Sequence, residues 1–221
     1  MSEQLVLVGI LLVAISGVPG LLLSRHSMDG QWLAVLLATA GCTIGLVGVG
    51  VFWVSGDSAA VVLPWPLIAG AEFRVALDGL SAFFLCPVFL IPLLGSIYGL
   101  GYWRQPEHPS NGRKLRLFYG LMTAGMGLFV IAWNGILFLM AWEAMALAAF
   151  FLVDTEDDNP EARTASWTYL VATHLATLAV IAMIALLRLA RGTFTLGPLD
   201  ADGVFPTAGR MERWPTRSSR P

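Results

Sequence analysis

The chain has 221 residues, of which 57% are hydrophobic and 13% are charged, and its formal net charge is −2. Soluble globular domains carry about twice that charged fraction, so the composition excludes an ordinary water-soluble domain. A net negative charge also argues against a nucleic-acid partner.

Apolar residues occur in unbroken blocks of about twenty, enough to cross a hydrocarbon core of about 30 Å as a helix. Lipid offers the backbone no hydrogen-bond partners, so such blocks must be helical. We therefore predict an all-α membrane protein, with a transmembrane region over residues 1–191 and a polar tail over residues 192–221. The predicted helices cover residues 5–23, 32–54, 79–103, 115–133, 136–153 and 161–189.

Three local signals accompany the first three predicted helices. Gly41 and Gly45 are four residues apart, a spacing that lets two helix backbones approach closely. The connection to the third helix alternates polar and apolar residues over 72–77, which is a weak strand signal. Asp78 then precedes the third helix, and we interpret it as a structural N-cap rather than a proton site.

The stretch over residues 115–153 is almost wholly apolar and too long for one span. As a single helix it would be about 58 Å long, twice the thickness of the hydrocarbon core. Asn134-Gly135 is the one turn signal inside it, so we predict that the chain folds back there. Pro160 suits the first position of the following helix.

Basic residues predict the orientation of the helices. Cytoplasmic loops are enriched in Lys and Arg. One side of the predicted membrane protein carries six such residues: Arg25, Arg104, Arg113, Lys114, Arg116 and Arg163. The opposite side carries only Arg74 before the sixth helix ends. We therefore predict an inner (plasma) membrane protein with the N-terminus outside and the loop 104–116 in the cytoplasm.

Glu143 is the one ionisable residue in the predicted helix 136–153. It lies ten residues from Val153, about 15 Å deep, near the middle of the membrane. A charge there costs about 2.5–3.5 kcal/mol on insertion scales, and such groups commonly carry protons or ions. Desolvation favours the protonated carboxyl and a nearby cation the ionised one, so the group can load and release a proton. The alternative is a protonated glutamate that hydrogen-bonds a neighbouring helix.

His174 on the next helix is the predicted companion of Glu143. It lies seven residues from Trp167, about 10 Å deep from the same side, so the two groups differ by about 5 Å in depth. Histidine suits a proton relay, and Thr173 and Thr177 flank it as candidates for a water-bearing relay. The alternative is a neutral histidine bonded to a helix carbonyl.

Two motifs together resemble the large antiporter-like membrane subunits of respiratory complex I, Mrp-type sodium/proton antiporters and membrane-bound hydrogenases. The first is Leu-Asp-Gly-Leu-Ser-Ala-Phe-Phe at residues 77–84. The second is Asn-Gly-Ile-Leu-Phe-Leu-Met-Ala-Trp-Glu-Ala-Met at residues 134–145. The run Tyr-Leu-Val-Ala-Thr-His-Leu-Ala-Thr at residues 169–177 resembles the branch of hydrogenase-4 component B and formate hydrogenlyase.

This resemblance implies proton translocation coupled to electron transfer in other membrane subunits of a hydrogenase-4-like or NADH dehydrogenase-like complex. We expect no catalytic residue, cofactor or metal in this chain, because its sequence contains no matching motif. In the family, the acid matching Glu143 pairs with a lysine on the next helix but one. Here Lys114 is the only lysine and falls in the loop 104–116. We therefore expect the N-terminal portion of such a subunit, truncated, frameshifted or fragmentary, with a tail that is not native.

Two other functions stay open at this point. The chain could be a structural or accessory membrane subunit that moves no ions. It could also be a component of a sodium/proton antiporter, with Na⁺ as a coupled ion and no redox partner.

Overall fold

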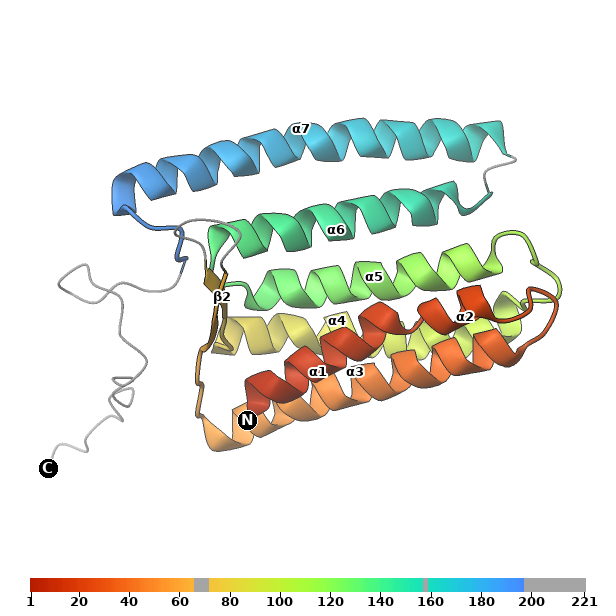
Figure 1. The fold of residues 1–221 in the computed structure, drawn as a ribbon, viewed down its shortest axis with the longest axis horizontal. Coiled ribbons are helices and arrows are strands. Elements are labelled where there is room, and N and C mark those ends of the chain that lie inside the picture. The colour runs from red at the N-terminus through yellow and green to blue at the C-terminus, as the bar shows by residue number, and fades with distance from the viewer. Residues whose placement is uncertain (66–71, 157–158, 197–221) are drawn as a thin grey trace, which may run out of the picture.

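The computed structural model describes residues 1–65, 72–156 and 159–196 (Figure 1). Its regular elements are, in chain order, α1 (Ser2–Ile15), α2 (Val18–Leu22), α3 (Asp29–Ser55), β1 (Val61–Pro64), β2 (Glu72–Val75), α4 (Gly79–Tyr102), α5 (Gly112–Ile131), α6 (Gly135–Val153), the 3-10 turn η1 (Asp154–Glu156) and α7 (Pro160–Arg191). Among the described residues, six spans are long and apolar enough to cross a membrane, with α1 and α2 counted as one. The predicted all-α membrane fold is confirmed.

The prediction of one continuous helix over residues 5–23 is wrong, because the first span is interrupted. Helix α1 ends at Ile15, and α2 begins at Val18 with Pro19 in its first turn. A side chain at Gly17 would run into the backbone of Leu117 on α5. Proline cannot donate a helical hydrogen bond, so Pro19 favours a break here, where the chain also packs tightly against α5.

Helix α5, the fourth span, also differs from its predicted bounds of 115–133. It begins three residues earlier, so part of the predicted loop 104–116, including Lys114, is helical. It ends two residues earlier, because Ala132 forms a bridge with Val75 at the end of β2. The backbone N–H of Trp133 donates to the carbonyl of Arg74 at 2.9 Å. Pairing with the strand therefore replaces the last part of the predicted helix.

Glycines bring α1 and α3 into backbone contact. A Cβ on Gly9 would lie 2.7 Å from the carbonyl oxygen of Gly41 and 2.9 Å from the Cα of Gly45. A Cβ on Gly45 would lie 2.5 Å from the ring of Phe89 on α4, which is fully buried. The close approach predicted for the Gly41/Gly45 pair is confirmed, and it builds the tight part of the bundle.

The strand signal at residues 72–77 is confirmed as β2, which pairs antiparallel with β1 in the register Val61↔Val75. A further segment joins this end of the bundle after α7. There the N–H of Gly135 donates to the carbonyl of Phe194 at 2.7 Å, and the N–H of Leu196 donates to the carbonyl of Trp133 at 2.8 Å. The first residues of the predicted tail thus bind the α5–α6 turn, and residues 197–221 lie outside the described part.

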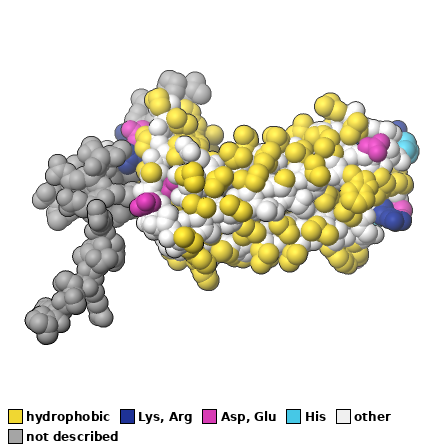
Figure 2. Space-filling view, turned by 90° about the horizontal axis from the view of Figure 1, so that it is seen from below, with side chains coloured by type: hydrophobic (Ala, Val, Ile, Leu, Met, Phe, Trp, Pro, Cys, Tyr) yellow, Lys and Arg dark blue, Asp and Glu magenta, His cyan; other side chains and the backbone are white. Residues whose placement is uncertain are grey.

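The helices lie side by side, with α6 beyond α5 and α7 at the outer edge (Figure 1). The α2–α3, α4–α5 and α6–α7 connections share one end of the molecule, and the β hairpin lies at the other. Hydrophobic side chains cover the helical body between those ends, and charged side chains gather at the ends (Figure 2). This is the distribution expected for a body surrounded by lipid and two ends in water.

Candidate functional site

Glu143 lies at the middle of α6, as the ninth of its 19 residues. Asn134 starts this helix, because its side-chain oxygen accepts from the N–H of Ile136 at 2.9 Å and from that of Leu137 at 3.4 Å. The turn predicted at Asn134-Gly135 is therefore confirmed. It fixes where α6 begins, and with it the depth of Glu143.

His174 lies near the middle of α7, as the fifteenth of its 32 residues. The side chain of Asn159 accepts from the N–H of Glu161 at 3.0 Å, and Pro160 occupies the first position, as predicted. His174 Nε2 lies 3.7 Å from Glu143 Oε2. The structure thus brings together the two groups that the sequence places at similar depth.

The second carboxyl oxygen of Glu143 is unpartnered. Oε1 is buried and has no hydrogen-bond partner among the residues that the structure describes. A buried acceptor without a partner costs about 1–3 kcal/mol, and more when it is charged. The carboxyl group is therefore set up to gain a proton or a further donor.

The histidine tautomer follows from its other contact. Nδ1 of His174 lies 2.9 Å from the carbonyl oxygen of Leu170, which can only accept, so Nδ1 must carry the proton. Nε2, facing Glu143, is then free to take up a proton and to share it with the carboxylate. This arrangement can pass a proton between the two side chains.

The two threonines flank the pair with their hydroxyl groups bonded to the backbone. Thr173 Oγ1 donates to the carbonyl of Tyr169 at 2.9 Å, and Thr177 Oγ1 donates to the carbonyl of Thr173 at 3.0 Å. Thr177 also accepts from Trp142 Nε1 at 3.0 Å, a contact between α6 and α7 that the sequence analysis missed. The sequence signals only that both residues lie close to the pair, since Trp142 precedes Glu143 by one residue and Thr177 follows His174 by three.

A groove of about 530 Å³ runs along the pair between α6 and α7. Its lining is apolar except for the pair and one threonine: Leu139, Glu143, Val171, His174, Leu175, Thr177, Leu178 and Ile181. The side chain of His174 is 48% exposed and that of Glu143 is 32% exposed. The site therefore opens on the outer side of the bundle.

The remaining predicted residue lies elsewhere. Asp78 accepts from the N–H of Ser81 at 2.6 Å, at the start of α4, so its interpretation as a cap is confirmed. Sequence analysis missed a polar cluster at the mouth of the α6–α7 pair. There Lys114 Nζ lies 3.5 Å from Asp154 Oδ2, and Ser166 Oγ donates to Asp154 Oδ1 at 3.3 Å.

Comparison with known proteins supports the resemblance stated from the motifs. Residues 132–203, which hold the pair, match the family described as NADH:quinone oxidoreductase/Mrp antiporter, transmembrane. NADH-quinone oxidoreductase subunit L of Mycobacterium tuberculosis is 32% identical over 149 residues, 63% of this chain and 21% of the relative. Hydrogenase-4 component B of Escherichia coli is 28% identical over 145 residues, 61% of this chain and 21% of the relative.

The fold has solved counterparts as well. A chain of the Mrp complex from Dietzia superposes with a TM-score of 0.69 at 20% identity, covering 88% of this chain and 20% of that chain. The chain spans about a fifth to a quarter of the length of the curated relatives it matches. The expected resemblance to antiporter-like membrane subunits is confirmed.

Proposed function

Since the chain is similar in sequence and fold to antiporter-like membrane subunits, we propose that it contributes an intramembrane proton site to such a subunit. The site is the Glu143–His174 pair. The ion is a proton, and the assembly is a hydrogenase-4-like or complex I-like redox complex with other membrane subunits. The pair forms one part of a path that further residues of the assembly complete.

One observation carries this proposal: two titratable side chains lie 3.7 Å apart at the middle of two apolar helices. Intramembrane ionisable groups are expensive and commonly mark ion pathways. A proton on His174 Nε2 can move to Glu143 Oε2, which converts an ion pair into a neutral pair. The empty acceptor at Oε1 lets the carboxyl take a second donor during transfer.

The proposed test replaces Glu143 with glutamine in the assembled complex, reconstituted in vesicles that contain a pH-sensitive dye. Glu143→Gln keeps the shape but cannot release a proton, so we expect proton flux to fall at least about tenfold with assembly unchanged. Glu156→Gln, which removes an exposed acid at the end of the same span, is the matched control and should leave the flux unchanged.

Two alternative functions have their own support and outcomes. A scaffold role is favoured by the bond between Trp142 and Thr177, which holds α6 to α7 without any titratable group. It predicts that Glu143→Gln leaves the flux unchanged. A sodium/proton antiporter is favoured by the fold likeness to the Mrp complex, and it predicts a flux that depends on Na⁺.

The relay and the orientation are part of the proposal. Thr173 and Thr177 would extend the path along α7 by exchanging their backbone bonds for bonds to water. The end with the α4–α5 connection would face the cytoplasm of the inner (plasma) membrane, because it carries most of the Lys and Arg residues of the short loops.

A further inference from the structure

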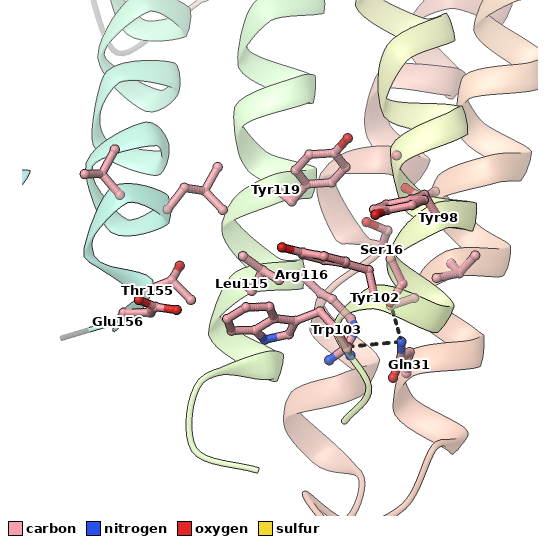
Figure 3. Close-up of a pocket in the computed structure, with 18 of the residues that line it drawn as sticks. Ser16, Gln31, Tyr98, Tyr102, Trp103, Leu115, Arg116, Tyr119, Thr155 and Glu156 are labelled. Atoms are coloured by element: carbon pink, nitrogen blue, oxygen red, sulfur yellow. Dashed lines mark hydrogen bonds between the residues drawn. The ribbon is translucent and has the colours of Figure 1, made fainter. Parts of the chain in front are cut away.

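A second hollow lies near the end of the bundle that carries the α4–α5 connection (Figure 3). It has a volume of about 560 Å³ and is bounded by α3, α4, α5 and the end of α6. Its wall is apolar along α3 and α6, at Ala34, Val35, Ala38, Leu152 and Val153. The Glu143–His174 pair has no part in it.

Aromatic side chains line this cavity (Figure 3). Tyr98 and Tyr102 stack with ring centroids 5.2 Å apart, and Tyr119 faces them from α5. Trp103 also lines the cavity, and its Nε1 is buried without a hydrogen-bond partner among the described residues. Tyrosine and tryptophan gather at the depth of lipid headgroups, where one end of the side chain is apolar and the other polar.

Arg116 places a positive charge in the same cavity. Its guanidinium donates to Gln105 Oε1 at 2.5 Å, to the carbonyl of Gly112 at 2.6 Å and to the carbonyl of Trp103 at 3.0 Å. All three acceptors are neutral. Across the described part of the chain no carboxylate lies within 4 Å of Arg116, although Glu156 lines the same cavity.

A buried network holds this arginine in position. The N–H of Gln105 donates to Gln31 Oε1 at 2.8 Å, and Gln31 Nε2 donates to the carbonyl of Gly99 at 3.1 Å. Both glutamines are almost fully buried. The three bonds above use three of the five N–H donors of Arg116, which leaves two for a ligand.

We propose that this cavity binds one anionic phospholipid, with its phosphate at Arg116 and Trp103 and an acyl chain against the apolar wall. Guanidinium pairs with phosphate through directed N–H donors. Each basic residue near a membrane surface adds about 1 kcal/mol to the attraction for anionic lipid. A helix of a partner subunit, about 10 Å across, does not enter a cavity of this size, whereas a chain of methylene groups does.

Two glycines of α4 give a matched test. A Cβ at Gly99 or at Gly101 would have no atom within 4 Å, so a side chain can start from either position into open space. Gly99 lines the cavity and Gly101 does not. Gly99→Phe therefore fills the cavity, and Gly101→Phe places the same side chain on the same helix outside it.

The measurement is native mass spectrometry of the purified, delipidated chain titrated with dioleoyl phosphatidylglycerol or dioleoyl phosphatidylcholine. We expect one phosphatidylglycerol to bind at least about tenfold more tightly than phosphatidylcholine, which corresponds to 1.4 kcal/mol. Gly99→Phe should weaken that binding at least tenfold, and Gly101→Phe should not change it. Arg116→Gln should remove the preference for the anionic lipid.

Three results would overturn the proposal: equal binding of the two lipids, equal binding by the two glycine variants, or a cross-link from position 99 to a partner polypeptide in the assembled complex. Circular dichroism establishes that each variant is folded. If Arg116→Gln fails to fold because it breaks the glutamine network, the proposal is tested by the relative affinities of the two lipids and by the comparison of Gly99→Phe with Gly101→Phe.

Discussion

The seam between α1 and α3 and the seam between α6 and α7 are built in opposite ways. In the first, glycines remove the side chains, and the backbones of Gly9, Gly41 and Gly45 meet. In the second, large side chains keep the helices apart, and a groove follows the Glu143–His174 pair. Six of the 14 residues of α1 are buried, whereas only three of the 32 residues of α7 are.

The two seams therefore differ in what they can do: the α1–α3 seam supports the bundle, and the α6–α7 seam can change its protonation. A seam of backbone contacts leaves no room for water or for a moving side chain, so it can only hold the helices together. A seam with a groove and an unpartnered carboxyl oxygen can change its protonation without disturbing the bundle. The seam of backbone contacts therefore lies among α1, α3 and α4, and the titratable pair lies at the opposite edge of the bundle, where α7 is outermost (Figure 1).

The largest effect is expected in the glycine seam. A Cβ at Gly41 would lie 2.8 Å from the carbonyl oxygen of Gly9 and 2.8 Å from Val13 Cγ2. Backbone cannot move aside as a side chain can, so Gly41→Leu should cost at least about 3 kcal/mol of folding free energy. Thermal unfolding followed by circular dichroism in detergent measures it.

Gly50→Leu is the control for that change, because it lies on the same helix with no atom within 4 Å of its Cβ position. It should leave the unfolding temperature close to that of the unchanged protein. If Gly41→Leu and Gly50→Leu have the same unfolding temperature, the backbone contact does not stabilise the bundle. The proposed difference between the two seams would then be wrong.

The sequence predicts the spans and their ends because those depend on local chemistry. Apolar blocks of twenty residues admit only helices in lipid, and Asp78, Asn134 and Pro160 mark helix starts through their own side chains. The break after Ile15 has a local cause in Pro19, but its place also depends on the contact between Gly17 and α5, which the sequence does not show. Long-range packing decides such features.

The candidate site also has features that the sequence predicts and features that depend on long-range packing. Counting residues from the helix ends gives the depth of Glu143 and His174, and the 3.7 Å contact agrees with that estimate. The bond between Trp142 and Thr177 depends also on how each helix is rotated about its axis, which the count does not give. The glutamine network around Arg116 could not be predicted from the sequence, because its residues lie far apart in the chain.

A second experiment sharpens the comparison at the α6–α7 seam. His174→Gln keeps a polar side chain beside Glu143 but removes the imidazole, which can accept and release a proton. We expect proton flux in the reconstituted complex to fall about tenfold, or 1.4 kcal/mol, and to vary less between pH 5 and pH 8. Vesicles with an internal pH dye report both quantities.

His26→Gln is the control, since His26 is exposed in the connection between α2 and α3. Its flux and pH profile should match those of the unchanged protein. An unaltered pH profile in His174→Gln would mean that the pair only fastens α6 to α7, and the two seams would then differ in packing alone.

The smallest expected effect concerns the bond that joins α6 and α7 without a titratable group. Thr177→Val keeps the shape of the side chain but removes the acceptor of Trp142 Nε1, which lies 3.0 Å away. Hydrogen bonds between membrane helices average about 0.6 kcal/mol in double-mutant cycles, so the loss of folding free energy should be of that order. Equilibrium unfolding in mixed micelles resolves it.

Thr173→Val provides the contrast, because the hydroxyl of Thr173 bonds only to carbonyls of its own helix, those of Tyr169 and Leu170. It should leave the stability unchanged, since a helix loses nothing when that hydroxyl is removed. The same two variants also separate fastening from relay. If both lower the proton flux while only Thr177→Val lowers stability, the threonines serve the path. If only Thr177→Val lowers the proton flux, and it also lowers stability, then the threonines contribute only through the bond between Thr177 and Trp142.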